Sequence, residues 1–297
     1  MSDAEYKPTT YFVMSLDPIH IGTGGYRLGR VDNTIVREAG TNLPKIPGTS
    51  IEGSARTYVY YAEQENKEIN EACAVGKELN KVEPCGICPV CVTFGFTTKK
   101  KSLHGMAQFS DARILFFPVH SMIGPVWVTT PKLLSDIGID KFSVADEHIR
   151  TNLVDKGKKL NLGWLYLENE EKFDLSSSLN EIPTDIKNKA VLISEKLFSR
   201  VVNSNLEVRT SVSIDPRTGT AEDGALFTYE AIPRATILWF DLVANDPGKF
   251  DVDSSIKSKE DVINEVEKSF NYFNTLGIGG MQTKGFGRLK RLSEDSK

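Results

Sequence analysis

The sequence contains no apolar run of the roughly 18 residues that a membrane-spanning helix needs. Its first residues, M-S-D-A-E-Y-K-P-T-T, also lack the charged and then apolar plan of a signal peptide. We therefore expect a cytoplasmic protein with no membrane partner. A general basic excess is missing as well, since the formal net charge is −4 and many nucleic-acid-binding proteins are strongly basic. The 297 residues, 40% of them hydrophobic and 26% charged, can still bury a sizeable core.

Two familiar phosphate-binding motifs are incomplete. A glycine-rich loop, H-I-G-T-G-G, follows a predicted strand over residues 10–16, but Arg27 stands where a dinucleotide-binding motif needs its third glycine. Near the end of the chain, Gly280 and Gly285 have the spacing of a P-loop, but Phe286 stands in place of its lysine. Both nucleotide-binding interpretations therefore fail, and tight turns in a compact fold are the plain alternative.

Positive charge nevertheless gathers beside these glycines. Residues 26–56 contain five Lys or Arg against three Asp or Glu, and residues 277–297 contain five against two. Glycine lets the backbone approach a ligand closely and arginine keeps its charge, so both segments suit a phosphodiester backbone. Asp32 is the one acidic residue among Arg27, Arg30 and Arg37. Taken alone, it is a candidate site residue, a turn residue or the partner of a neighbouring arginine.

A helix is predicted after the P-G-T-S turn at residues 47–50. Thr49 and Glu52 have the spacing of a capping box, and Ile51 and Ala55 begin an apolar face. The first turn of such a helix carries unsatisfied N–H groups. We therefore expect an anion site there, near Arg56.

All four cysteines lie in one segment, at Cys73, Cys85, Cys88 and Cys91. In a reducing compartment, thiols clustered in this way predict a closed tetrahedral zinc site that stabilises a loop. The spacing C-x11-C-x2-C-x2-C differs from that of a paired zinc ribbon, so an alternative ligand set uses His104 in place of one cysteine. Reduced free cysteines and redox chemistry are further alternatives.

The remaining pattern predicts an α+β chain. Strands are expected over residues 107–119, 124–129 and 160–167. One helix with Ile186, Ala190, Ile193, Leu197 and Val201 on one face is expected to start at Thr184 and to end at residues 203–205.

A long hairpin with the polar tip D-P-R-T-G-T-A-E-D-G is predicted within residues 206–236, and Ser258 is expected to start a helix that stops at Gly277. The order strand, helix, two strands, helix, strand is the ferredoxin-like (RRM-like) plan. We predict one domain over residues 1–297, with a Cys-rich insertion at 66–103 and a second insertion at 141–178.

Several motifs together resemble one protein family. They are H-I-G-T-G-G, D-N-T-I-V-R-E, P-K-I-P-G-T-S-I-E-G-S-A-R-T, D-A-R-I-L-F-F-P-V-H-S, I-D-P-R-T-G-T-A-E-D-G-A-L-F-T-Y-E and G-I-G-G-M-Q-T-K-G-F-G-R. The chain resembles the repeat-associated mysterious protein (RAMP) superfamily, and within it the backbone subunits of type III CRISPR effector complexes, which serve antiviral defence. The D-A-R-I-L-F-F-P-V-H-S motif and the length are similar to the type III-B (Cmr) form, its fourth subunit.

The resemblance implies an RNA-guided endoribonuclease. Such subunits stack as copies of one another along CRISPR RNA, beside other Cmr subunits, and cleave the paired target RNA. A thumb hairpin, here residues 206–236, enters between bases, and Asp32 matches the catalytic aspartate of the family. We expect Asp32 to bind Mg²⁺ or Mn²⁺ or to assist deprotonation of the 2′-OH. We favour the metal because nearby arginines should lower the pKa of Asp32. The products should be a 2′,3′-cyclic phosphate and a 5′-OH.

His20 is a second candidate catalytic residue, with a structural histidine as the alternative. The residues expected to contact RNA are Arg27, Arg30, Lys45, Ser50, Arg56, Pro216, Arg217, Tyr229, Glu230, Gly279, Gly280, Gln282, Thr283 and Lys284. A non-catalytic RNA scaffold and a guide-RNA-processing endoribonuclease are the competing functions.

Overall fold

The computed structural model describes residues 6–24, 31–65, 69–250, 252 and 254–293, and shows a mixed α/β chain. The chain forms two compact units, each assembled from segments that are distant in the sequence. The first unit comprises Met1–Tyr11, Ile46–Ala112 and Phe240–Ile278, and the second comprises Phe12–Lys45, Arg113–Trp239 and Gly279–Lys297. The single domain over residues 1–297 and its two insertions stay predictions.

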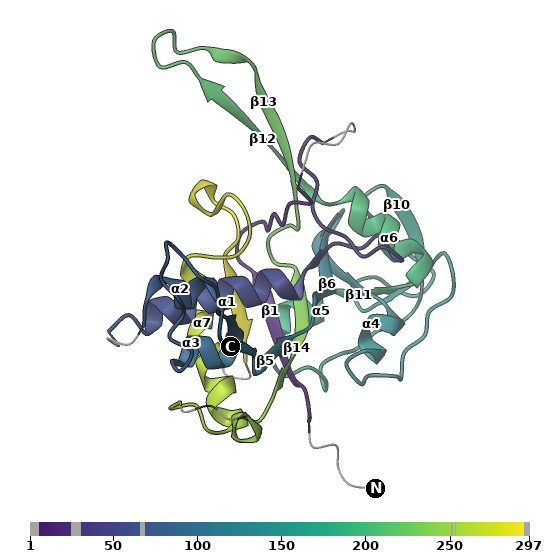
Figure 1. The fold of residues 1–297 in the computed structure, drawn as a ribbon. Coiled ribbons are helices and arrows are strands. Elements are labelled where there is room, and N and C mark those ends of the chain that lie inside the picture. The colour runs from purple at the N-terminus through teal and green to yellow at the C-terminus, as the bar shows by residue number, and fades with distance from the viewer. Residues whose placement is uncertain (1–5, 25–30, 66–68, 251, 253, 294–297) are drawn as a thin grey trace, which may run out of the picture. The chain divides into compact units, whose positions relative to one another are not determined.

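The helices and strands are drawn in Figure 1. The helices are α1 Gly48–Ala62, α2 Glu71–Val75, α3 Pro89–Phe94, α4 Pro131–Ser135, α5 Thr184–Asn188, α6 Glu195–Ser204 and α7 Lys259–Thr275, with 3-10 turns η1 Pro247–Lys249 and η2 Gln282–Lys284. The strands are β1 Thr9–Ser15, β2 Lys45–Ile46, β3 Gly95–Thr97, β4 Ser102–His104, β5 Ala107–Phe109, β6 Ala112–Ser121, β7 Gly124–Thr129, β8 His148–Thr151, β9 Lys159–Leu162, β10 Leu165–Glu171, β11 Ala190–Ile193, β12 Glu207–Ile214, β13 Ala221–Ala231, β14 Ile237–Ala244 and β15 Leu289–Leu292. Over the described ranges, none of these helices combines the length and the apolar character that crossing a membrane requires.

The second unit is built on a mixed β-sheet. Its strands follow the order β15-β1-β14-β6-β7-β11-β8-β10-β9, with β1 and β14 contributing the residues that belong to this unit. β1 and β15 are antiparallel, with Phe12 opposite Leu292, whereas β7 and β11 are parallel, with Trp127 opposite Ala190. Parallel neighbours need a long crossover, and the segment from α4 to α5 supplies it.

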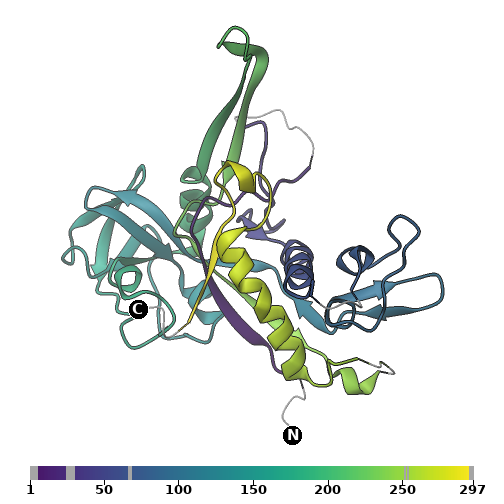
Figure 2. The same ribbon diagram turned by 90° about the vertical axis from the view of Figure 1, so that its left-hand side faces the viewer.

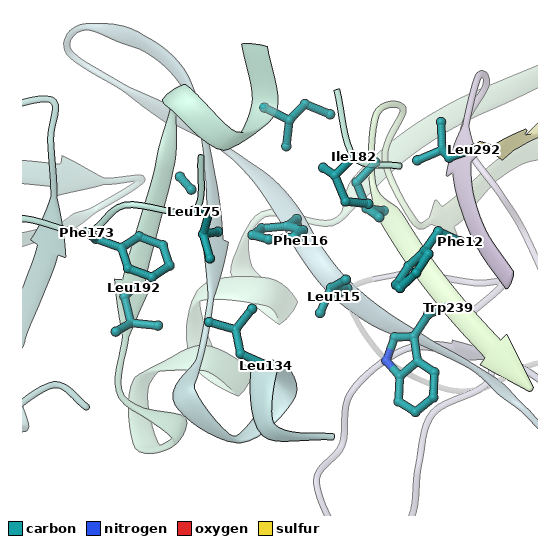
Figure 3. Packing of buried hydrophobic residues seen from close by; sticks show 13 residues of the cluster. Phe12, Leu115, Phe116, Leu134, Phe173, Leu175, Ile182, Leu192, Trp239 and Leu292 are labelled. Atoms are coloured by element: carbon teal, nitrogen blue, oxygen red, sulfur yellow. The ribbon is translucent and has the colours of Figure 1, made fainter. Parts of the chain in front are cut away.

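A hydrophobic cluster forms the core of this unit (Figure 3). It brings together Phe116 of β6, Leu192 of β11 and Leu134 of α4, all 0% exposed, with Phe173 beyond the end of β10. Burying one such side chain stabilises the fold by about 1.5–3 kcal/mol relative to leaving it exposed. The core therefore provides a rigid base for the segments at the sheet edge.

The first unit packs α1 against α7. The ring of Tyr58 stacks on Tyr272, with 5.5 Å between the ring centroids, and its hydroxyl donates to the Gly277 carbonyl at 2.5 Å. α7 begins as predicted, because Ser258 and Asp261 form a complete capping box. In the same unit, β5 pairs with the second half of β14.

The capping box predicted at Thr49 and Glu52 is wrong. α1 begins at Gly48 after Pro47, and no side chain caps it. The Gly48 N–H donates to a carboxylate oxygen of Asp111 at 2.8 Å, so an acidic side chain of the same unit lies where an external anion was expected.

The single helix predicted from Thr184 is also wrong. It consists of two helices, α5 and α6, separated by the strand β11. Ala190–Ile193 is buried at all four positions because β11 lies between β7 and β8. A short apolar run that is buried on both faces fits a helical period and a central strand equally well, so periodicity alone misassigned it. The strand predicted over residues 160–167 is likewise two strands, β9 and β10, which turn at Gly163.

Candidate functional site

A long antiparallel hairpin leaves the sheet of the second unit. β12 and β13 pair from Glu207 opposite Ala231 to Ile214 opposite Ala221, within the predicted segment 206–236. In both views the hairpin extends as an arm from the other strands of its unit (Figures 1 and 2). It carries exposed apolar side chains, among them Leu226, which is 63% exposed. A lone two-stranded hairpin is marginally stable in water, and exposed apolar groups mark contact surfaces, so the arm is suited to a partner.

Asp32 lies at the base of this hairpin. Its Oδ2 accepts hydrogen bonds from the Thr228 backbone N–H at 2.8 Å and from the Thr228 hydroxyl at 2.7 Å. The same hydroxyl accepts from the Asp32 N–H at 2.9 Å, so one threonine fixes both the backbone and the carboxylate. Both hydrogen bonds from Thr228 fall on Oδ2. Oδ1 receives neither of them and can accept from or bind another ligand.

The residues after Asp32 run alongside β13. The Asn33 N–H donates to the Thr228 carbonyl at 3.0 Å, and the Glu230 N–H donates to the Asn33 carbonyl at 2.9 Å. Asn33 and Tyr229 form a parallel β-bridge. The position of the carboxylate is thus coupled to the position of the hairpin.

These hydrogen bonds keep Asp32 ionised. The backbone N–H and the hydroxyl of Thr228 lower the pKa of Asp32 below its ordinary value of 3.8. The direction matches the sequence expectation, and the donors named here belong to Thr228, whereas the guanidinium of Arg37 pairs with Glu230 at 2.7 Å. Arg27 and Arg30 lie outside the described residues. A carboxylate of this acidity is a weak general base at neutral pH and a good ligand for a cation.

His20 is buried where three segments meet. Its side chain is 7% exposed, and its Nδ1 lies 2.6 Å from the Glu230 carbonyl, to which it donates when the ring is neutral and protonated at Nδ1. Its ring stands edge-on to Tyr229, with 5.7 Å between the centroids. The structure therefore gives His20 a positioning role at the base of the hairpin, and its catalytic role stays a prediction.

The two glycine-rich segments meet at His20. The Gly280 N–H donates to the His20 carbonyl at 2.9 Å. Gly279 has a φ of +85°, and a Cβ at this position would lie 2.5 Å from the same carbonyl oxygen, so the close approach requires glycine. Beyond them, η2 exposes Gln282, Thr283 and Lys284.

Arg209 of β12 anchors the hairpin to this C-terminal turn. It donates to the Gly285 carbonyl at 3.2 Å, and its guanidinium lies 4.8 Å from the centroid of the Phe286 ring. Each strand of the hairpin is thus held at its base by a different glycine-rich segment. Such anchoring holds an exposed arm in a defined direction.

Glu230, expected to contact target RNA, has partners within its own unit. It is 7% exposed, pairs with Arg37, and accepts from the Ile35 N–H at 3.3 Å. The structure gives Glu230 a role in fixing the chain around Asp32. Contact with RNA stays a prediction for Tyr229, which is half-buried.

The other predicted RNA contacts differ in accessibility. Pro216 and Arg217 lie at the exposed turn of the hairpin, where Arg217 pairs with Asp215 at 3.4 Å. Lys45 is half-buried in β2 of the second unit, and Ser50 is half-buried in α1 of the first unit. All of them remain predictions.

Like Glu230, Arg56 is a predicted contact whose surroundings argue against RNA. Its side chain is 8% exposed and donates to the carbonyls of Cys73, Phe94 and Gly95. All its nitrogens therefore point into the first unit, so we remove Arg56 from the RNA-binding set.

The four cysteines form a cluster in the first unit. The sulfur atoms of Cys73, Cys85, Cys88 and Cys91 all lie within 4.8 Å of one another. Bonds of about 2.3 Å to one zinc ion would place tetrahedral sulfurs about 3.8 Å apart, so a small contraction completes a site. Three sulfurs also accept backbone N–H groups, from Cys85, Cys88 and Cys91, at 3.3–3.4 Å, so backbone hydrogen bonds hold the loop around the cluster. His104 is outside this group and packs against Phe250.

A sequence model of the RAMP superfamily matches residues 13–290. The chain belongs to the RAMP superfamily. A RAMP relative, the CRISPR system Cmr endoribonuclease Cmr4 of Pyrococcus furiosus, is 29% identical over 303 residues, which cover 93% of this chain and 92% of the relative. Membership of the RAMP superfamily explains why motifs that lie far apart in the sequence all resemble one family.

Solved structures share the fold. A chain of the type III-B Cmr-beta complex bound to cognate target RNA has a TM-score of 0.68 at 16% identity, with 97% of this chain and 98% of that chain covered. The crystal structure of Cmr4 has a TM-score of 0.60 at 22% identity, with 97% and 99% covered. Oligomeric Cmr4 from Pyrococcus furiosus has a TM-score of 0.59 at 20% identity, with 97% and 98% covered.

Sequence reasoning missed three residues that shape this RAMP site. Thr228 binds Asp32, Arg37 pairs with Glu230, and Arg209 binds the C-terminal turn. Arg37 was expected to supply positive charge or to pair with Asp32, and its carboxylate partner is Glu230 instead. Nothing in the local sequence marks Thr228 or Arg209.

Proposed function

We propose that this chain is a backbone subunit of a type III-B CRISPR RNA-guided complex. Copies of it would stack along the CRISPR RNA, beside other Cmr subunits, and cleave the paired target RNA at regular intervals in the cytoplasm. The observation that carries the proposal is Asp32, held by Thr228 at the base of an exposed hairpin in a chain of the RAMP superfamily. The endoribonuclease name of the Pyrococcus relative supports it.

The arrangement of strands supports a ferredoxin-like plan with a thumb. β15-β1-β14-β6 is the spatial order of the fourth, first, third and second strands of that plan, and α1 and α7 occupy its two helical positions in the sequence. Within the plan, β12 and β13 form the thumb, and the segment with the cysteines is an insertion. A subunit that stacks head to tail without closing a ring suits a linear ligand of repeating length.

The proposed reaction is an internal attack on the RNA backbone. The 2′-oxygen bonds to the adjacent phosphorus, the bond from phosphorus to the 5′-oxygen breaks, the 2′-OH loses its proton, and the leaving oxygen gains one. In an A-form duplex the 2′-OH is not in line with this bond. The hairpin would therefore select the cut by splaying one nucleotide, and the products carry a 2′,3′-cyclic phosphate and a 5′-OH.

Asp32 contributes a fixed negative charge beside the scissile phosphate. Magnesium binds through one or two carboxylates plus substrate phosphates, and Asp32 Oδ1 offers one such ligand. Mg²⁺ or Mn²⁺ held there would neutralise charge that develops on the phosphate. Thr228 keeps the carboxylate ionised and oriented, and His20 holds the backbone around it.

The guide backbone would contact exposed residues of the second unit. Gln282, Thr283 and Lys284 present a polar, basic turn, and Gly279 and Gly280 would add backbone contacts beside it. Recognition of phosphate and ribose positions the RNA, whereas base pairing supplies sequence specificity. A structural zinc ion at Cys73, Cys85, Cys88 and Cys91 completes the proposal.

Assembly of the complex with Asp32→Ala tests the function. We expect target cutting to stop while guide binding continues, and wild-type cutting to stop in EDTA. Asp185→Ala, which removes an exposed aspartate of α5, serves as the matched control and should cut normally. Retained cutting by the Asp32→Ala complex contradicts the catalytic assignment and favours a non-catalytic scaffold.

A guide-processing endoribonuclease is the remaining alternative. It predicts metal-independent cutting of repeat RNA by the isolated chain through a histidine. The burial of His20 and the hydrogen-bond contact of its Nδ1 with Glu230 weigh against this alternative. Inert purified protein on repeat RNA would remove it.

A further inference from the structure

We infer that Arg56 stabilises the zinc site of the first unit in two ways. It connects the two ligand-bearing helices to α1 through hydrogen bonds, and its positive charge balances the negative charge of the zinc–thiolate group. The inference rests on the zinc of the proposed function and is independent of RNA cleavage. Arg56 was expected to contact RNA, and the inference gives it a role at the metal site instead.

The guanidinium of Arg56 reaches the C-terminal ends of both short helices. Its Nε and Nη2 donate to the Cys73 carbonyl of α2 at 3.0 and 2.9 Å. Its Nη1 donates to the Phe94 carbonyl at 3.2 Å, and Nη2 donates to the Gly95 carbonyl at 2.6 Å, at the end of α3. The last carbonyls of a helix lack partners within it and attract a cation. α2 carries Cys73 and α3 carries Cys91, so one side chain of α1 joins two ligand-bearing helices.

The charge of Arg56 needs a counter-charge. The side chain is 8% exposed, and Glu52, the carboxylate recorded beside it, lies 3.8 Å from Nη1. A buried cation is costly unless negative charge is close. Four thiolates around one Zn²⁺ leave the group with a formal charge of two minus, and the guanidinium binds the backbone of this group directly.

Gly76 makes room for the guanidinium. It caps α2 with a φ of +74°, and a Cβ at this position would lie 2.5 Å from Arg56 Nη2. Any other residue at position 76 therefore strains the turn and displaces the arginine. Gly157 of the second unit has a φ of +79° and nothing within 4 Å of an added Cβ, so it provides the same backbone strain without the contact.

The experiment measures zinc per chain and the rate of zinc release to a chromophoric chelator. Wild type should contain one zinc ion, and each Cys→Ser variant should lose it. Arg56→Met should release zinc roughly 10–100-fold faster, as for other groups that support metal ligands from outside. Arg56→Lys should be intermediate, because one ammonium cannot bridge two helix ends. Arg200→Met, at an exposed arginine of α6, is the matched control and should behave as wild type.

A second pair of variants keeps the inference testable if Arg56→Met fails to fold. Gly76→Ala should speed zinc release, whereas Gly157→Ala should not. If wild type expressed with added zinc contains none, the metal proposal itself is contradicted. Zinc in wild type with unchanged release from both Arg56→Met and Gly76→Ala would leave the metal in place and overturn the role of Arg56.

Discussion

The base of the hairpin and the cysteine cluster hold charged groups in opposite ways. Asp32 is half-buried, and Thr228 donates to Oδ2. Arg56 is 8% exposed, and its Nε, Nη1 and Nη2 all donate to backbone carbonyls of the same unit. The first arrangement keeps capacity for a ligand from outside, whereas in the second every nitrogen is bound within its own unit.

This difference suggests separate roles, with the hairpin base suited to chemistry and the cysteine cluster suited to stability. A carboxylate held on one oxygen can exchange ligands on the other, which catalysis requires. A guanidinium bound to backbone carbonyls contributes only by staying in place. Changes at the hairpin base should therefore alter cutting and spare the fold, and changes at the cluster should do the reverse.

The largest effect is expected for Asp32→Asn. Asparagine keeps an oxygen that accepts from Thr228 but removes the negative charge. If the charge, or a metal that it binds, lowers the activation free energy of cutting by several kcal/mol, its removal slows cutting by about 10³-fold. The rate on paired target RNA in the assembled complex measures it, and zinc content should match wild type. Near-normal cutting would mean that the shape of the side chain matters and its charge does not.

Removal of zinc should have the next largest effect, on the first unit alone. With zinc at about 100 times its Kd, removal lowers the free energy of unfolding by about 2.7 kcal/mol. Hydrogen exchange before and after chelation measures it, with protection lost in α2, α3, β3 and β4. The strands β7 and β11 of the second unit are the internal control and should keep their protection. Equal loss in both units, or no loss in either, contradicts the comparison.

Features of each site that depend on residues close together in the sequence could be predicted. The four cysteines are close in the chain, and their spacing alone predicted the cluster. Ser258 and the apolar face behind it predicted α7, and Asp32 stood out among arginines. These features depend on short-range spacing, which a sequence displays directly.

The partners of these residues could not be predicted. Thr228 is 196 positions from Asp32, and the carbonyls of Phe94 and Gly95 are 38 and 39 positions from Arg56. Only the folded chain brings such pairs together. A backbone carbonyl has no sequence signature, so an arginine that binds carbonyls looks the same in the sequence as one that binds phosphate.

A smaller effect is expected for Thr228→Val, which removes the hydroxyl bound to Asp32. The pKa of Asp32 should rise toward its ordinary value, because the hydroxyl of Thr228 is one of the hydrogen-bond donors that lower it. In wild type the lowered pKa contributes stability that is present above the unfolded pKa and is lost as the pH falls through the folded pKa. NMR titration of the aspartate carboxyl carbons measures the pKa in wild type and in Thr228→Val. An unchanged pKa would mean that the backbone hydrogen bonds alone hold the carboxylate.

The smallest effect on stability is expected for Leu226→Ser on the arm. Leu226 is 63% exposed, so the free energy of unfolding should change by no more than about 0.5 kcal/mol. Cutting should nevertheless slow, by up to about tenfold if the side chain buries about 1.5 kcal/mol of apolar contact against RNA bases. Met122 is also 63% exposed in the second unit but lies in the turn between β6 and β7, so Met122→Ser is the matched control. The two apolar side chains that are replaced have the same exposed fraction. Slower cutting by Leu226→Ser alone therefore assigns the effect to the hairpin. Equal slowing by both would remove the thumb role, even with Asp32 still required.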